Sequence, residues 1–151
     1  MSAVIEDIRT AVSTVDDPEY PGVSVTDLGL VENIDLEGDR ASISMIPTYG
    51  GCPALDFIAD DVREAVEALD GVSTCEVQWL RSPVWTQDRV SARVVQLLER
   101  EFTVTLRRRD GSLVCPVCGS GTVRDTAPMG PSRCRSLAFC DDCRNPIEVM
   151  R

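Results

Sequence analysis

Apolar residues recur at helical spacing in three segments of the N-terminal two thirds of the chain. This spacing predicts helices over residues 3–12, 53–69 and 89–100. The middle segment shows the pattern best, because acidic residues fill the face opposite its apolar stripe. Two prolines and a glycine within residues 18–22 prevent the first helix from continuing.

Between these helices the hydrophobic pattern changes to a period of two residues, which is typical of strands. Alternation predicts strands over residues 30–37, 40–46 and 74–80. Residues 38–39 are Gly-Asp, a two-residue loop that favours a β-hairpin. The resulting order, α-β-β-α-β-α, predicts an α+β fold with a mainly antiparallel sheet.

Charge and cysteine content divide the chain. Residues 1–104 have a net charge of −13, whereas residues 105–151 have a net charge of +3 and contain five of the seven cysteines. The change falls in a polar stretch that contains glycine, as linkers often do. We therefore expect an acidic domain over residues 1–104, a linker over residues 105–112 and a cysteine-rich module over residues 113–151.

The composition excludes several kinds of chemistry, because the chain has no histidine and its 15 positive residues are all arginine. Catalytic Ser-His-Asp and Cys-His sets, histidine-bound metals and Schiff-base lysines are thereby ruled out. No signal peptide and no apolar run of about 20 residues is recognisable, so we expect a cytoplasmic protein without a membrane span. In a reducing compartment, clustered cysteines bind metal more often than they form disulfides.

Four cysteines of the module form two C-x-x-C units. Cys115 and Cys118 make the first, Cys140 and Cys143 make the second, and 21 residues separate the two units. This spacing is close to that of a tetrahedral zinc site, and four thiolates leave no open position, so a structural zinc ribbon is expected. A redox dithiol pair and an iron or iron–sulfur centre on the same cysteines are the alternatives.

Three cysteines lie outside this set. Cys52 follows two glycines and precedes Pro53, a residue suited to the first position of a helix. Amide groups and the dipole at a helix start stabilise a thiolate, although Cys52 could equally be a small residue at a crowded turn. Cys75 lies on an apolar strand face and is expected in the core. Cys134 is either a fifth, exchangeable metal ligand or a buried small residue.

Several short motifs resemble the iron–sulfur assembly domain of SufT-like proteins. They are Asp-Pro-Glu at residues 17–19, Asp-Leu-Gly-Leu-Val at residues 27–31 and Thr-Tyr-Gly-Gly-Cys-Pro at residues 48–53. The fold of that family agrees with the order of elements predicted above. The resemblance implies that Cys52 is the functional cysteine. Our hypothesis is that its thiolate takes part in transient binding of an iron–sulfur cluster or iron. We expect Asp17, Glu19 and Asp27 to shape the site around it.

The C-terminal part extends the resemblance to the PaaD family, also called PaaJ. Ser-Pro-Val-Trp-Thr at residues 82–86 and Arg-Cys-Arg-Ser-Leu at residues 133–137 carry this similarity together with the two C-x-x-C units. The resemblance implies an accessory protein of phenylacetate degradation, not an enzyme, which assembles or maintains the metal or iron–sulfur centres of the phenylacetyl-CoA oxygenase. Oxygenase subunits and iron–sulfur assembly proteins are the expected partners, and a homodimer is left open.

Two other functions remain open at this point. One is a non-catalytic structural or adaptor subunit of the oxygenase complex, in which Cys52 is inert, and the other is a thiol–disulfide catalyst. Nucleic-acid binding is not expected, because a four-thiolate zinc site reduces the charge of the module to about +1 and the acidic domain repels phosphate.

Overall fold

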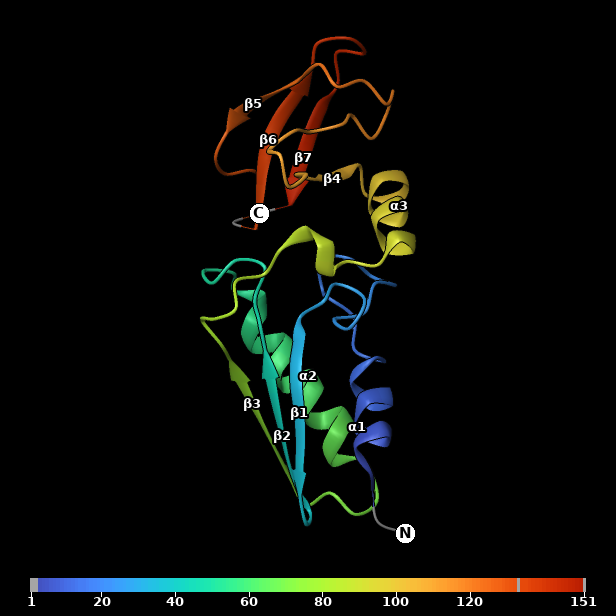
Figure 1. Ribbon diagram of the computed structural model, residues 1–151, viewed down its shortest axis with the longest axis vertical. Coiled ribbons are helices and arrows are strands. Elements are labelled where there is room, and N and C mark those ends of the chain that lie inside the picture. The colour runs from blue at the N-terminus through green and yellow to red at the C-terminus, as the bar shows by residue number, and fades with distance from the viewer. Residues whose placement is uncertain (1–2, 133, 151) are drawn as a thin grey trace. The chain divides into compact units, whose positions relative to one another are not determined.

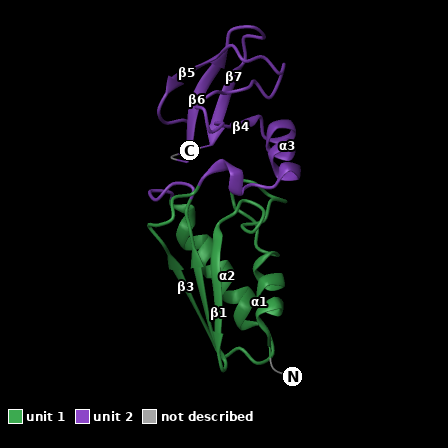
Figure 2. Ribbon diagram, viewed as in Figure 1, with its two compact units in different colours: residues 1–47, 53–85 green, residues 48–52, 86–151 purple. Residues whose placement is uncertain are grey.

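The computed structural model describes residues 3–132 and 134–150 of the chain. These residues form two compact units (Figure 2). The first unit comprises residues 1–47 and 53–85, and the second comprises residues 48–52 and 86–151. The division therefore falls at residue 85 and not near residue 104, where the change of charge predicted it. The expected linker is also corrected, because it begins inside strand β4 (Val104–Leu106), whose three residues are buried.

The first unit contains a three-stranded sheet in the order β1-β2-β3 (Figure 1). Strands β1 (Val31–Glu37) and β2 (Arg40–Met45) form the predicted antiparallel hairpin. Strand β3 (Thr74–Trp79) pairs with β2 in parallel, which corrects the expectation of a mainly antiparallel sheet. The parallel pairing follows from helix α2 (Ala54–Glu67), which forms the crossover between β2 and β3.

Helices α1 (Ile5–Val12) and α2 contact each other, and each contacts the sheet. Both helices bury residues at helical spacing, as the sequence pattern predicted. The buried helical residues of the two helices are Ile8, Val12, Ile58, Val62 and Val66. Together with the buried residues of β1 and β2, they form the core of the first unit.

The second unit contains helix α3 (Ala92–Glu101) and a four-stranded sheet in the order β4-β7-β6-β5. Strands β5 (Val123–Ala127), β6 (Arg135–Cys140) and β7 (Pro146–Met150) are antiparallel neighbours, and β4 pairs with β7 in parallel. By sequence, residues 122–126 and 136–139 suit short strands, in agreement with β5 and β6, whereas β4 and β7 have no such prediction. A small core lies on this sheet and includes Leu113, Cys115, Ala138, Cys140, Ile147 and Val149.

Among the described residues, no helix has the length and apolar character needed to cross a membrane.

Candidate metal centre and thiol site

The four cysteines of the two C-x-x-C units converge on one point. Their sulfur atoms all lie within 4.8 Å of one another. The Sγ–Sγ distance is 3.6 Å between Cys115 and Cys143 and also 3.6 Å between Cys118 and Cys140, so each unit contributes to both pairs. This grouping is the ligand set of a tetrahedral thiolate centre, and the predicted metal ligands are brought together.

Each C-x-x-C unit forms a tight turn around its first cysteine. The amide groups of Val117 and Cys118 lie 3.4 and 3.5 Å from the Sγ atom of Cys115 and point toward it. The Gly119 amide then donates to the carbonyl oxygen of Cys115 at 2.9 Å. Such N–H···S contacts stabilise a thiolate, so the backbone prepares this sulfur for a metal ion.

Asn145 supports the second C-x-x-C unit, formed by Cys140 and Cys143. Its role was not identified from the sequence. Its side-chain Nδ2–H donates to the Cys143 Sγ atom at 3.3 Å. This hydrogen bond is the main reason why the pKa of the Cys143 thiol is lowered to about 6. The hydrogen bond thus favours the thiolate form of Cys143, which is the form that binds metal. An amide side chain two residues after a C-x-x-C unit is the only sequence signal that could have indicated this role.

Two arginines of the module have side-chain partners within it. Arg124 lies over the Phe139 ring, 5.1 Å from its centroid, and its Nε atom is 3.1 Å from an Asp141 carboxylate oxygen. Arg135 and Glu148 form a partly buried ion pair at 2.7 Å. These arginines and this aromatic face therefore stabilise the ribbon internally.

Cys52 lies on the loop between β2 and α2. Pro53 is the N-cap residue of α2 and not its first helical residue, and Cys52 directly precedes this N-cap. The Cys52 amide donates to the carbonyl oxygen of Tyr49 at 3.2 Å, and the cysteine is half-buried. Gly51 packs under the same tyrosine, because a Cβ atom there would lie 3.1 Å from the ring.

The structure places Cys134 beside Cys52 and not in the four-cysteine centre. Their Sγ atoms are 3.7 Å apart, although 82 positions separate the residues in the sequence. Both residues belong to the second unit, since residues 48–52 cluster with it. This pairing of two thiols could not be read from the sequence, where neither residue has a nearby cysteine partner.

The three predicted carboxylates lie in the loop that follows α1, in the first unit. An Asp17 carboxylate oxygen accepts from the Glu19 amide at 2.8 Å, and the Asp27 amide donates to the Ser24 hydroxyl at 3.0 Å. All three carboxylate residues are half-buried. The loop thus holds Asp17, Glu19 and Asp27 in defined turns, and their action together with Cys52 stays a prediction.

Cys75 has the environment expected of a core residue. It is 5% exposed on β3, and burial, followed by the nearby Glu67 carboxylate, raises the pKa of its thiol to about 11. The Glu67 side chain also accepts a hydrogen bond from the Cys75 amide at 2.9 Å. Cys75 is therefore a protonated, inaccessible thiol at neutral pH.

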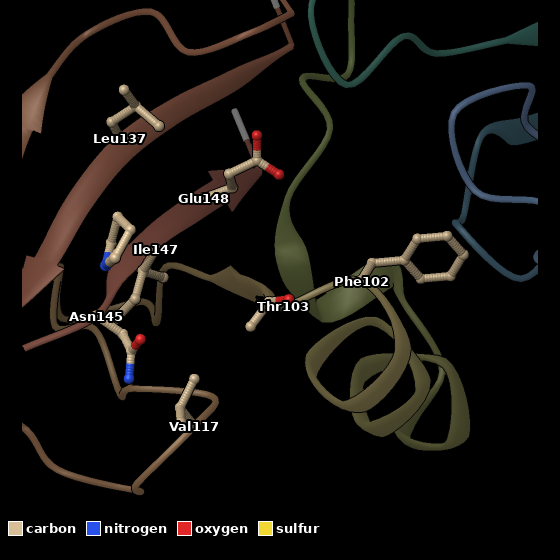
Figure 3. Close-up of a pocket in the computed structure, with 8 residues that line it drawn as sticks. Phe102, Thr103, Val117, Leu137, Asn145, Ile147 and Glu148 are labelled. Carbon is tan, nitrogen blue, oxygen red and sulfur yellow. The ribbon is translucent and has the colours of Figure 1, made fainter. Parts of the chain in front are cut away.

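A cavity of about 480 Å³ lies in the second unit next to the four-cysteine centre (Figure 3). Val117 and Asn145 from the two cysteine turns line it, together with Leu137, Ile147 and Glu148 of β6 and β7. Its lining is a mixture of apolar and polar groups without a thiol. We assign no chemistry to it.

Comparison with known proteins agrees with both parts of the chain. Residues 5–79 match the family described as iron–sulfur cluster assembly protein, and residues 99–151 match the PaaD zinc beta ribbon domain. An Escherichia coli (strain K12) protein, provisionally named as one of the subunits of 1,2-phenylacetyl-CoA epoxidase, is 29% identical over 97% of this chain and 92% of its own length. An Fe-S protein maturation auxiliary factor of Porphyromonas gingivalis is 42% identical over 57% of this chain and 82% of its own length.

A solved structure shows the same fold for the first part. The crystal structure of a DUF59 domain from Bacillus anthracis superposes with a TM-score of 0.59 at 30% identity, and covers 64% of this chain and 92% of that one. Together, the α+β domain and the four-cysteine module define a small metal-binding protein of iron–sulfur cluster maturation. The chain belongs to the iron–sulfur cluster assembly protein family, in the branch that carries a PaaD zinc ribbon.

Proposed function

We propose that this protein is an accessory factor that assembles or maintains the metal or iron–sulfur centres of a phenylacetyl-CoA oxygenase. The observation that carries the proposal is the separation of two kinds of thiol in one chain. Four cysteines close one centre completely, while Cys52 lies half-exposed outside it on a glycine-containing loop. A closed centre stabilises a fold, and an accessible thiol can bind cargo and release it.

The four-cysteine centre takes zinc in this proposal and has a structural role. A module of about 50 residues buries too little apolar surface to be stable alone, so metal binding supplies much of its folding free energy. Metal analysis of protein purified without oxygen should give one zinc per chain and no visible absorbance. Visible absorbance from iron that disappears in a Cys115→Ser variant would instead assign an iron centre to these cysteines.

Cys52 is the residue that handles cargo, and Asp17, Glu19 and Asp27 are the carboxylates that shape its surroundings. The protein itself performs no oxygenation, because it supplies neither histidine nor a cofactor-binding motif. The names of the relatives support this reading, since they describe maturation factors and an epoxidase component.

The test is co-expression of the oxygenase subunits with either the wild-type protein or a Cys52→Ala variant. We expect the variant to fold and to keep its zinc, while the iron content and activity of the purified oxygenase fall together. Cys75→Ala is the matched control, because it removes a buried thiol that the proposal does not use. Full oxygenase iron and activity with Cys52→Ala, together with stable co-purification, would instead identify a structural adaptor subunit.

A further inference from the structure

The position of Cys134 points to a second thiol site in the second unit. Its Sγ atom is 3.7 Å from that of Cys52, and it is not among the four clustered cysteines of the ribbon. The two residues come from segments that are 82 positions apart, so their proximity is a property of the fold and not of a local turn. The two thiols are therefore a candidate pair of ligands for one metal ion.

The distance between the two sulfur atoms fits shared metal coordination. With metal–sulfur bonds of about 2.3 Å, the ligands of a tetrahedral ion are ~3.7–3.8 Å apart. The sulfur pairs of the four-cysteine centre are 3.6 Å apart in this same structure. The pair formed by Cys52 and Cys134 therefore has the spacing that two ligands of one metal ion require.

The two cysteines of the pair differ in how far solvent can reach them. Cys134 is 5% exposed, whereas Cys52 is half-buried and follows two glycines. A Cβ atom built on Gly50 would meet nothing within 4 Å, so the loop is uncrowded at that position. The Ser132 hydroxyl lies 3.4 Å from the Cys134 Sγ atom, where it can donate a hydrogen bond to a thiolate.

The loop that carries Cys52 is held by contacts that fix its path. Residues 48–52 cluster with the second unit even though the residues on both sides belong to the first. Within the loop, the Tyr49 carbonyl oxygen accepts from the Cys52 amide, and the Tyr49 ring lies 3.1–3.3 Å from where a Cβ atom at position 51 would be.

We propose that Cys52 and Cys134 together form a two-thiolate site for iron, as the free ferrous ion or as one iron atom of a cluster. The proposal rests on the proposed function and specifies where the cargo is held. Thiolates favour iron–sulfur chemistry over hard-cation binding, and binding releases the two thiol protons without any redox step. Two thiolates leave two coordination positions for exchangeable ligands, so this iron can be passed on, unlike an ion closed by four cysteines.

The test is titration of the zinc-loaded full chain with ferrous iron under anaerobic conditions. Bound iron is counted after desalting, and X-ray absorption at the iron edge identifies sulfur ligands. The wild-type protein and the control Cys75→Ser should each bind about one iron per chain with sulfur ligation. Cys52→Ser and Cys134→Ser should each lower the iron affinity at least tenfold while the zinc content stays unchanged. Cys134→Ser with wild-type iron affinity overturns the site.

A second measurement covers the case in which a variant fails to fold. Iron should protect Cys52 and Cys134 of the wild-type protein together from alkylation, as mapped on peptides by mass spectrometry. Alkylation of Cys134 at the same rate with and without iron overturns the site. The proposed function is judged separately, by the co-expression test. It stands if Cys52→Ala lowers the iron content of the oxygenase, even when no iron binds to the pair of thiols. It fails if the oxygenase has its normal iron content with Cys52→Ala, even when both thiols of the wild-type protein bind iron.

Discussion

Arg144 occupies, in the second cysteine turn, the backbone position that Gly119 occupies in the first. Each residue directly follows the second cysteine of its unit, and each donates its amide to the carbonyl oxygen of the first cysteine, at 2.8 Å for Arg144 and 2.9 Å for Gly119. The φ angles are +61° and +79°. Glycine adopts this left-handed conformation without steric cost, whereas a residue with a Cβ atom is destabilised there by roughly 1–2 kcal/mol.

Arg144→Gly should therefore stabilise the metal-loaded protein, by about 0.5–1 kcal/mol after the larger chain entropy of glycine is subtracted. Gly119→Ala should destabilise it by a similar or larger amount, and only through its φ angle, because a Cβ atom there meets nothing within 4 Å. Denaturant unfolding measures both changes. Arg144→Ala is the control, since it removes the charged side chain but keeps the Cβ atom, and a gain as large as that of glycine would contradict the explanation.

Asn145 should govern how the four-cysteine centre responds to pH. Its hydrogen bond is the main cause of the pKa of about 6 at Cys143, so replacing Asn145 should raise that pKa toward the usual value of 9.0. Near pH 7 the variant thiol must then lose a proton when metal binds, and the metal affinity should fall by about 10- to 100-fold. The two proteins should converge above pH 9, where the thiol ionises in both. Competition with a chromophoric chelator at several pH values measures this.

Asn145→Asp is the most informative replacement, because it keeps the shape of the side chain but cannot donate a hydrogen bond when ionised. Asn145→Gln is the companion variant that keeps the donor. If Asn145→Asp binds zinc with wild-type affinity at pH 7, the hydrogen bond has no role in metal binding.

Local patterns predicted much of this fold. The hairpin of β1 and β2 depends on a Gly-Asp turn, with Gly38 at φ +61°, and on alternating residues on both sides of that turn. The four-cysteine centre depends on two short motifs whose geometry is built into each turn. In both cases the residues that decide the structure are close in sequence, so a single sequence contains the necessary information.

Long-range pairings were the part that the sequence did not predict. Strand β4 is only three residues long and is fixed by parallel pairing with β7, more than 40 positions later. The approach of Cys134 to Cys52 likewise needs the whole second unit to be folded. Charge also misplaced the boundary between units, because helix α3 has two glutamates and two arginines, so its charge does not show that it belongs with the basic ribbon. Charge reflects solvent exposure, whereas the boundary is set by packing.

Cys75 should make the protein less stable at high pH. Its pKa is raised from 9.0 to about 11 by burial, so between these values the unfolded chain loses the thiol proton and the folded chain retains it. The stabilisation is complete below pH 9 and declines as the pH rises toward 11, by about 1–2 kcal/mol. Urea unfolding at pH 8 and pH 10.5 measures the decline. The chain has no lysine, so no lysine titration adds to the change in stability over this range.

Cys75→Ala removes the group that titrates and should therefore reduce the difference between the two pH values. The variant will be somewhat less stable at pH 8, because it loses a buried sulfur atom, so the comparison is between slopes and not between absolute stabilities. An unchanged slope would show that another group causes the alkaline loss.

The two tryptophans should differ in what their indole nitrogens contribute to stability. Trp85 Nε1–H donates to the carbonyl oxygen of the buried Leu28 at 2.7 Å and so ties residues 80–85 to the turn that carries Asp27. Trp79 Nε1 is buried but has no hydrogen-bond partner among the residues that the structure describes. Trp85→Phe should therefore cost about 1–3 kcal/mol for the lost hydrogen bond, in addition to lost packing.

Trp79→Phe should cost less than Trp85→Phe, because it removes an unsatisfied polar group along with part of the ring. The free energy of that relief offsets some of the packing that the smaller side chain gives up. Each variant keeps one tryptophan, so fluorescence follows unfolding in both, and far-ultraviolet circular dichroism provides a common second signal. A greater loss for Trp79→Phe than for Trp85→Phe would mean that ring packing, and not the hydrogen bond to Leu28, determines how strongly each indole stabilises the first unit.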